Sequence, residues 1–280
     1  METSKKNRFK AICILGAGNI GMAIANGLVA SGKFLAKDLT LTRRRIQHLE
    51  EAGKKGFSIT DDNRKGVRDS SVLILAVEPQ QLNSLLDEIR SDLDPARHIL
   101  ISVITGAPIR QIRARIGNDV PIVRAMPNTA IANREAMTCI SAEAPGDATE
   151  IAESIFEAVG QTLVIEEEQM TAATALGACG IAFFLRAIRA ASQGGIEIGF
   201  QSHDALLIAA QTAKGAASLL LSRQNHPEFE IDRVTTPRGC TISGLNQMEH
   251  EGFSSAMIKG ILTSADIASK LYNTGGDAGT

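Results

Sequence analysis

Three glycines near the N-terminus have the spacing of a phosphate-binding turn. The segment GAGNIG at residues 16–21 follows a short apolar run and precedes apolar residues at helical intervals. Gly16 would permit a tight turn, Gly18 would let a pyrophosphate approach the backbone, and Gly21 would let the helix pack closely on its strand. The amides of Asn19 and Ile20 would face the phosphates from a helix N-terminus. These five residues therefore predict a dinucleotide site.

The end of the second expected strand, Leu39–Thr42, indicates which dinucleotide binds. An NAD enzyme usually carries an acidic residue there, which binds the ribose hydroxyls. In this chain Thr42 is followed by three arginines, and Asp38 comes before the strand. A hydroxyl and guanidinium groups suit a ribose 2′-phosphate. We expect Thr42, Arg43 and Arg44 to favour NADPH, with NADH as the other candidate; otherwise the arginines form a solvated start to a helix.

Composition and charge exclude several classes of protein. The chain has 280 residues, 44 % of them hydrophobic, and a formal net charge of −2. No long basic run suggests a nucleic-acid or anionic-membrane surface. Residues 1–10 (METSKKNRFK) make a poor signal peptide. We expect no apolar stretch of the ~18–20 residues that a membrane span needs, and hence a cytoplasmic protein.

The cysteines and histidines do not have metal-ligand spacing. Cys13, Cys139, Cys179 and Cys240 include no CxxC pair, and the five histidines include no HxxxH pair. Four reduced thiols and no metal site are the expectation.

Strands and helices are expected to alternate over the first 165 residues. Near-continuous apolar runs such as Ser71–Val77 are typical of parallel strands covered on both faces. The expected strands are Lys10–Leu15, Leu39–Thr42, Ser71–Val77, Ile99–Val103, Pro121–Arg124, Ala136–Ser141 and Thr162–Ile165, with helical segments Ile20–Ser31, Gln80–Ser91 and Ile109–Ile116 between them. This alternation predicts a parallel α/β sheet.

The second half of the chain reads as helical. Met170–Ile198, His203–Leu221 and Ser254–Leu271 are rich in Ala and Leu at helical spacing. Long helices with so much apolar surface in a small domain often bury it against another subunit. We therefore predict domains at residues 1–165 and 166–272, a disordered tail at 273–280, and a homodimer or higher homo-oligomer.

Four motifs, in order, resemble those of the pyrroline-5-carboxylate reductase family. They are GAGNIG at 16–21, AVEPQ at 76–80, RAMPNT at 124–129 and VTTPRGCTI at 234–242, and the resemblance covers roughly residues 9–272. It implies an NAD(P)-binding Rossmann domain, a helical dimerisation and substrate domain, and subunits that interlock. The implied reaction is NADPH-dependent hydride transfer to the cyclic imine 1-pyrroline-5-carboxylate, which gives L-proline in the last step of proline biosynthesis.

The resemblance also assigns further residues to the cofactor and to the substrate. Asn63 would contact the adenosine ribose, and the residues implied near the rest of the cofactor are Ala76, Val77, Pro79, Thr105, Met126 and Pro127. The loop at 236–241 would cradle the substrate, with the Thr241 hydroxyl near the imine nitrogen as the catalytic group. The other implied substrate contacts are Gly239, Cys240, Arg238, Ala178, Cys179, Glu167 and Asn128. A free backbone amide in a Pro/Gly loop is suited to hold a carboxylate.

Three departures from the family pattern fall near the expected ligands. Glu78 stands where the family has lysine, GACGIAF at 177–183 replaces SGSGPAY, and Pro237-Arg238-Gly239 replaces PGG. Small hydroxyls are lost and a guanidinium is gained. One hypothesis is that Arg238 takes over part of the carboxylate binding; the alternative is that it points to solvent.

Other functions remain open at this point. A paralogous imine or keto-acid reductase would fit the changed motifs, as would a non-catalytic NADPH-binding paralogue. A β-hydroxyacid dehydrogenase would need a lysine on the first long helix of the second domain, and none lies between Thr171 and Phe200.

Overall fold

A computed structural model describes residues 11–117, 119–144, 146–223 and 225–271. The chain divides into two compact units. The first unit runs to Ala178 and resumes at Ser264, and the second is Cys179–Thr263. The predicted domain boundary at residue 166 stays a prediction, and the tail predicted at 273–280 lies outside the described residues.

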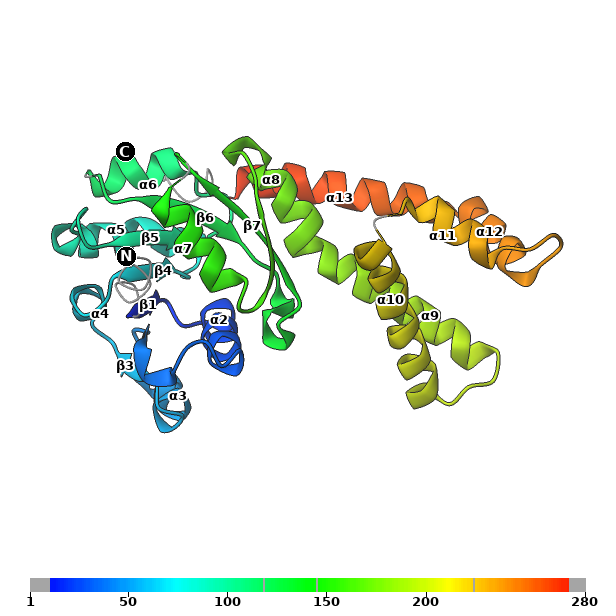
Figure 1. The fold of residues 1–280 in the computed structure, drawn as a ribbon, viewed down its shortest axis with the longest axis horizontal. Coiled ribbons are helices and arrows are strands. Elements are labelled where there is room, and N and C mark those ends of the chain that lie inside the picture. Colours follow the sequence, from blue (N-terminus) through cyan, green and yellow to red (C-terminus); the bar gives the residue numbers. More distant parts are fainter. Residues whose placement is uncertain (1–10, 118, 145, 224, 272–280) are drawn as a thin grey trace. The chain divides into compact units, whose positions relative to one another are not determined.

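The first unit is built on one eight-stranded sheet with the order β3-β2-β1-β4-β5-β6-β7-β8 (Figure 1). The strands are β1 Ile12–Leu15, β2 Leu39–Thr42, β3 Ser58–Thr60, β4 Val72–Leu75, β5 Ile99–Ser102, β6 Ile122–Met126, β7 Ala136–Ala142 and β8 Gly160–Val164. Every neighbouring pair is parallel except β6 and β7. The predicted α/β class is confirmed, although β3 was not predicted because its sequence, Ser-Ile-Thr, contains no apolar run.

Helices cover both faces of this sheet, and the central strands β1, β4, β5 and β6 bury alternate residues in two different cores. Ile12 and Ile14 of β1 pack in one hydrophobic cluster, and Cys13 and Leu15 pack in the other. Residues of α2 (Asn19–Ala30), α3 (Glu50–Lys54) and α7 (Asp147–Phe156) join the first cluster, and residues of α4 (Asn63–Arg68), α5 (Leu82–Ile89) and α6 (Ile109–Ile116) join the second. Burial on both sides explains why the strands read as continuous apolar runs.

Short helical turns complete the first unit. The 3₁₀ turns are η1 Ala36–Asp38, η2 Ile46–Leu49, η3 Pro79–Gln81, η4 Arg90–Asp92, η5 Thr129–Asn133 and η6 Glu167–Gln169. After η6 the chain forms α8 (Met170–Ala173) and then a π-helical segment, Thr174–Cys179. π-helical turns are rare and are often found at functional sites.

The remaining elements are all helical: α9 Gly180–Glu197, α10 Ser202–Arg223, α11 Pro227–Val234, α12 Cys240–His250 and α13 Phe253–Lys270. The all-helical C-terminal half is confirmed, with α9 and α10 packed as a hairpin. The expectation of a loop over 236–241 is corrected at one end, because Cys240 and Thr241 already belong to the first turn of α12.

The second unit buries very little of itself. Among its described residues, 179–223 and 225–263, only Gly180, Ser192 and Ala205 are buried. Large apolar side chains are open to solvent, including Ile198 at 79 % and Leu262 at 64 % exposure. Since exposed apolar patches of this kind usually mark protein interfaces, we expect a partner to cover this unit.

Two helices are long and apolar enough to cross a membrane by length and composition alone, namely Glu167–Glu197 and Ser202–Arg223. The expectation that no stretch would reach that length was therefore too strict. Such helices are weak evidence for a membrane, since the buried core helix of a soluble protein passes the same test.

Burial lowers the pKa of His98, with the Arg97 guanidinium adding to the effect. The His98 side chain is 2 % exposed, and its Nδ1 accepts a hydrogen bond of 2.8 Å from the Asp94 amide. The unfolded chain therefore binds a proton more readily than the folded protein below the ordinary pKa of about 6.5.

We expect the free energy of unfolding to fall as pH drops below about 6.5, by up to about 1.4 kcal/mol per pH unit from this residue. His98→Asn, which keeps a hydrogen-bond acceptor and cannot titrate, should flatten that slope between pH 6.5 and 5. Denaturant unfolding across this range measures it. An unchanged slope in the variant would assign the effect to another group; the lowered pKa of Asp92 acts in a more acidic window.

Candidate active site

The glycine turn between β1 and α2 has the geometry of a phosphate site. Gly16 has φ +94°, and a Cβ there would lie 2.5 Å from Val77 Cγ1. A Cβ built on Gly18 meets nothing within 4 Å. Only glycine fits at Gly16, therefore, and there is open space above Gly18.

The N-terminus of α2 offers amides to a ligand in that space. Gly18 is the N-cap, and glycine has no side chain that could cap these amides. The first bond of the helix runs from the Met22 amide to the Gly18 carbonyl at 2.9 Å, so the preceding amides of Asn19 and Ile20 have no partner within the helix. Such amides bind phosphate oxygens, and the turn fits the pyrophosphate of a dinucleotide.

The loops after β1 and β4 meet at this turn. Ala76 is buried and Val77 half-buried, and both lie against the position of a Gly16 Cβ. β1 and β4 are neighbours in the sheet. β2 and β3 continue the sheet on one side of this pair, and β5 to β8 continue it on the other. Ligands of open α/β sheets bind at the carboxyl ends of the strands at such a switch point.

The other predicted residues of this edge lie at the ends of neighbouring strands. Pro79 opens η3 after β4, and Thr105 is half-buried after β5. Met126 ends β6 and Pro127 follows it, both buried. Glu78, the departure from the family pattern, is exposed before η3.

Thr42 is buried at the end of β2. Its side chain is 0 % exposed, and Oγ1 accepts from the Gly16 amide at 3.3 Å and donates to Asn63 Oδ1 at 2.6 Å. The Thr42 hydroxyl therefore stabilises the glycine turn through its hydrogen bond with the Gly16 amide. Direct contact of Thr42 with a cofactor stays a prediction.

Arg43 and Arg44 follow Thr42 at the end of β2. Arg43 is half-buried and Arg44 is exposed. Within the part of the chain that the structure describes, neither guanidinium has an ion pair or a side-chain hydrogen bond. Both are therefore available to an anionic ligand.

Asn128 joins β6 to the π-helical segment. Its Oδ1 accepts from the Ala130 amide at 3.1 Å and so caps η5, and its Nδ2 donates to the Gly177 carbonyl at 3.3 Å. Ala178 and Cys179 complete this π-helical segment, and both are half-buried. The structure therefore gives Asn128 a positioning role for the segment in which the family pattern has changed.

Glu167 makes two interactions inside the first unit. Its Oε1 accepts from the Ile109 amide at the start of α6, at 2.6 Å, and from Arg124 Nη1 at 3.3 Å. The Arg124 side chain is 7 % exposed and that of Glu167 is 29 % exposed. Burial lowers the pKa of Arg124, and the charge of Glu167 opposes this.

Removing the Glu167 carboxylate is expected to destabilise the fold, because a buried guanidinium and a helix N-terminus would lose their acceptor. We expect Glu167→Ala to lower the free energy of unfolding by about 2 kcal/mol, and Glu167→Gln by less. Glu168→Ala, at an exposed neighbouring position, is the control. Normal stability of Glu167→Ala with a loss of imine turnover would instead support the substrate contact that the resemblance implies.

The predicted substrate loop lies in the second unit as a tight turn before α12. The Gly239 amide donates to the Thr236 carbonyl at 2.9 Å, and a Cβ on Gly239 would lie 2.5 Å from Thr236 Oγ1. Arg238 has φ +59° and an exposed side chain, as in a type II turn, which favours glycine at that position.

The first amides of α12 have no partner within the helix. Gly239 is its N-cap and makes no side-chain capping hydrogen bond. Cys240 is exposed and Thr241 is half-buried in this first turn. An eleven-residue helix beginning in this way can hold a carboxylate at its amides.

The structure groups the predicted cofactor residues along one sheet edge of the first unit. The predicted substrate residues are divided between the units: Glu167, Asn128 and Ala178 belong to the first, and Cys179 and Arg238–Thr241 to the second. Sequence reasoning missed Glu88, which accepts from Asn63 Nδ2 at 3.0 Å.

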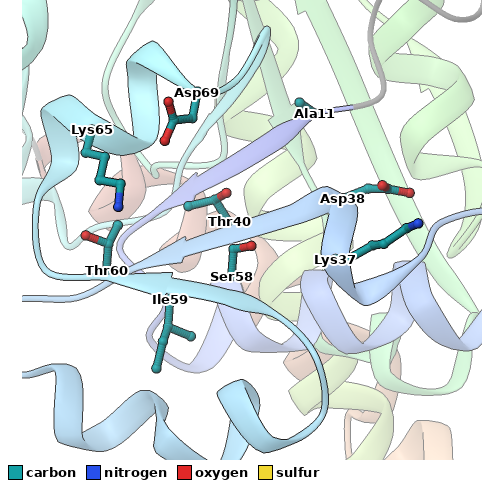
Figure 2. Close-up of a pocket in the computed structure, with 9 residues that line it drawn as sticks. All are labelled: Ala11, Lys37, Asp38, Thr40, Ser58, Ile59, Thr60, Lys65 and Asp69. Carbon is teal, nitrogen blue, oxygen red and sulfur yellow. The ribbon is translucent and has the colours of Figure 1, made fainter.

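No metal centre is apparent in the described part of the chain, where no group of three His, Cys, Asp or Glu could hold an ion. None of the predicted residues lines the pocket of about 380 Å³ shown in Figure 2. It is lined by Ala11, Lys37, Asp38, Thr40, Ser58, Ile59, Thr60, Lys65 and Asp69.

A doubly wound sheet with a glycine turn at its switch point is typical of dinucleotide-binding enzymes such as NAD(P)-dependent oxidoreductases. Residues 11–106 match the family described as NADP oxidoreductase coenzyme F420-dependent, and residues 167–271 match pyrroline-5-carboxylate reductase dimerisation. The chain belongs to the pyrroline-5-carboxylate reductase family.

Named relatives agree with this assignment. Pyrroline-5-carboxylate reductase 2 of Dictyostelium discoideum is 50 % identical, with 96 % of this chain and 95 % of that protein covered. Pyrroline-5-carboxylate reductase 1 of the same organism is 53 % identical over 93 % of this chain, and this chain spans about half (50 %) of its length. A solved pyrroline-5-carboxylate reductase from Coxiella burnetii is 29 % identical, with a TM-score of 0.85 and coverage of 94 % and 98 % of the two chains.

Proposed function

We propose that this protein reduces 1-pyrroline-5-carboxylate to L-proline with NADPH. The strongest support is the relative of that name at 50 % identity over nearly the full length of both chains. The glycine turn, which fits a dinucleotide pyrophosphate, supports the proposed use of NADPH.

The residues of the first unit would bind and orient the cofactor. The amides after Gly18 would hold the pyrophosphate, and Arg43 and Arg44 the ribose 2′-phosphate. Ala76, Val77 and Thr105 would line the nicotinamide end at the carboxyl edge of the sheet. When bound, the cofactor supplies a hydride for the imine carbon.

The residues of the second unit would bind the substrate. The first amides of α12 suit a carboxylate, and the Thr241 hydroxyl would deliver or stabilise the proton at the ring nitrogen. A protonated imine is already electrophilic, so orientation and proton supply are the contributions required of the protein.

The test is NADPH consumption by the full-length protein with 1-pyrroline-5-carboxylate, followed by analysis for proline. Stoichiometric proline is the expected result. NADPH binding without turnover would support a non-catalytic paralogue, and turnover of a keto acid but not of the imine would support a different reductase.

Arg238 is proposed to hold part of the substrate carboxylate in place of the hydroxyls missing at Ala178 and Cys179. A guanidinium can bind a carboxylate through two hydrogen bonds. Because Arg238 has φ +59°, glycine is the substitution that preserves the turn, whereas alanine would leave a strained backbone.

We expect Arg238→Gly to lower kcat/KM for 1-pyrroline-5-carboxylate ~10-fold, the loss of one charged contact. The same variant should act almost normally on 1-pyrroline, which has no carboxylate. Steady-state rates with both imines measure this. Equal losses on the two substrates would mean that Arg238 shapes the turn and does not bind the acid.

Assembly and location follow from the same family assignment. The matched dimerisation region, residues 167–271, includes the helices with exposed apolar side chains. We propose a homodimer, or a larger homo-oligomer, that covers them. The four cysteines are unpaired, which agrees with a cytoplasmic location, and no nucleic-acid or membrane partner is proposed.

A further inference from the structure

Four residues form a continuous series of hydrogen bonds from the glycine turn to α5. The Gly16 amide donates to Thr42 Oγ1 at 3.3 Å, Thr42 Oγ1 donates to Asn63 Oδ1 at 2.6 Å, and Asn63 Nδ2 donates to Glu88 Oε2 at 3.0 Å. This series links the ends of β1 and β2 with the first residue of α4 and with α5.

The donor at one end of this series of hydrogen bonds and the acceptor at the other determine which atom donates in every bond between them. An amide nitrogen can only donate, and an ionised carboxylate can only accept. Glu88 must therefore face the Asn63 NH₂ group, which turns Asn63 Oδ1 toward Thr42. The Thr42 hydrogen then has its acceptor, and the Thr42 oxygen remains available to the Gly16 amide. Each donor meets an acceptor in only one orientation of the Asn63 amide.

Thr42 transmits this orientation to the turn that would hold the pyrophosphate. Its side chain is completely buried, so water cannot replace either hydrogen bond. Its carbonyl also accepts from the Ala17 amide at 2.8 Å. Thr42 therefore holds two consecutive amides of the turn, and a Thr42 hydroxyl without an acceptor would be costly in this position.

We infer that Glu88 is a positioning residue for the dinucleotide, acting through Asn63 and Thr42 on the Gly16 turn. This rests on the proposed dinucleotide site and not on the identity of the imine. Glu88 would act on the part of the site that NADP⁺ and NAD⁺ share, unlike Arg43 and Arg44, which would act only on the 2′-phosphate.

The inference also predicts how Asn63 meets the ligand. Its Oδ1 is engaged by Thr42, and within the described residues its Nδ2 has one acceptor, Glu88. The second hydrogen on Nδ2 is then the group left to donate to a ribose or phosphate oxygen. With Glu88 in place, Asn63 presents a donor.

The test measures binding of NADP⁺ and NAD⁺ to the cofactor-free, full-length protein by titration calorimetry. Glu88→Met removes the acceptor at similar length and should weaken both nucleotides ~3–10-fold. Glu88→Gln removes the charge but keeps an acceptor, and should stay within about twofold of the wild type. Amide hydrogen exchange in the nucleotide-free protein should show faster exchange at Gly16 and Ala17 in Glu88→Met only.

A double-mutant cycle distinguishes an effect of Glu88 on nucleotide binding that passes through Thr42 from a local effect of Glu88. In Thr42→Val the series of hydrogen bonds is already broken, so adding Glu88→Met should weaken nucleotide binding less than about twofold further. The inference would be overturned if Thr42→Val and Glu88→Met weakened nucleotide binding additively. It would also be overturned if Glu88→Met and Glu88→Gln weakened nucleotide binding equally. Nucleotide binding that follows this pattern in a protein that fails to reduce the imine would retain the role of Glu88 and reject the proposed reaction.

Discussion

Replacing Arg43 and Arg44 together by alanine is expected to raise the KM for NADPH ~10–100-fold and to leave the KM for NADH nearly unchanged. An increase of that size corresponds to the loss of roughly 1.5–3 kcal/mol, the contribution of one guanidinium–phosphate contact, and only NADPH carries the 2′-phosphate. The two arginines follow β2 without an ion pair in the described residues, so their removal should not disturb the fold.

Initial rates with each cofactor at saturating imine measure this effect. Arg110→Ala, at an exposed position on α6, is the control for the loss of a positive charge and should change neither KM. Losses of equal size for NADPH and NADH would place the two arginines away from the 2′-phosphate and would remove the basis for NADPH preference.

Thr241→Ala is expected to lower kcat/KM for 1-pyrroline-5-carboxylate ~10–100-fold, at or below the low end for a positioned acid–base group. Solvent can supply part of the missing proton, which limits the loss. The dissociation constant of NADPH should not change, because Thr241 lies on α12 in the second unit and the predicted cofactor residues lie in the first.

Thr241→Ser is the matched variant, because it keeps the hydroxyl and loses only a methyl group. It should retain most of the wild-type rate. If Thr241→Ala turned over the imine as fast as the wild type, Thr241 would have no part in the chemistry, and water or another donor would have to supply the proton.

The sequence was most informative where the chemistry is local. The three glycines lie within six residues of one another, and their spacing alone predicted the turn between β1 and α2. Strands buried on both faces were equally clear. The three-residue strand β3 was missed because hydrogen bonding to β2 stabilises it, and its sequence carries no pattern.

Contacts between distant segments could not be predicted in this way. Glu88 and Asn63 are 25 residues apart, and nothing in either segment signals that they meet. The burial of Thr42 and its bond to Gly16 likewise depend on the parallel register of β1 and β2. The predicted substrate residues were assigned by the resemblance alone.

The second unit has few buried residues, and this affects how the stability of the folded protein depends on its concentration. With Gly180, Ser192 and Ala205 as its only buried residues in the described range, most of its stabilisation is expected to come from the proposed association. Mass action then makes the folding equilibrium depend on the concentration of chains. Dilution would unfold these helices without any change of solvent, and a newly made chain would be exposed to aggregation until it met a second copy.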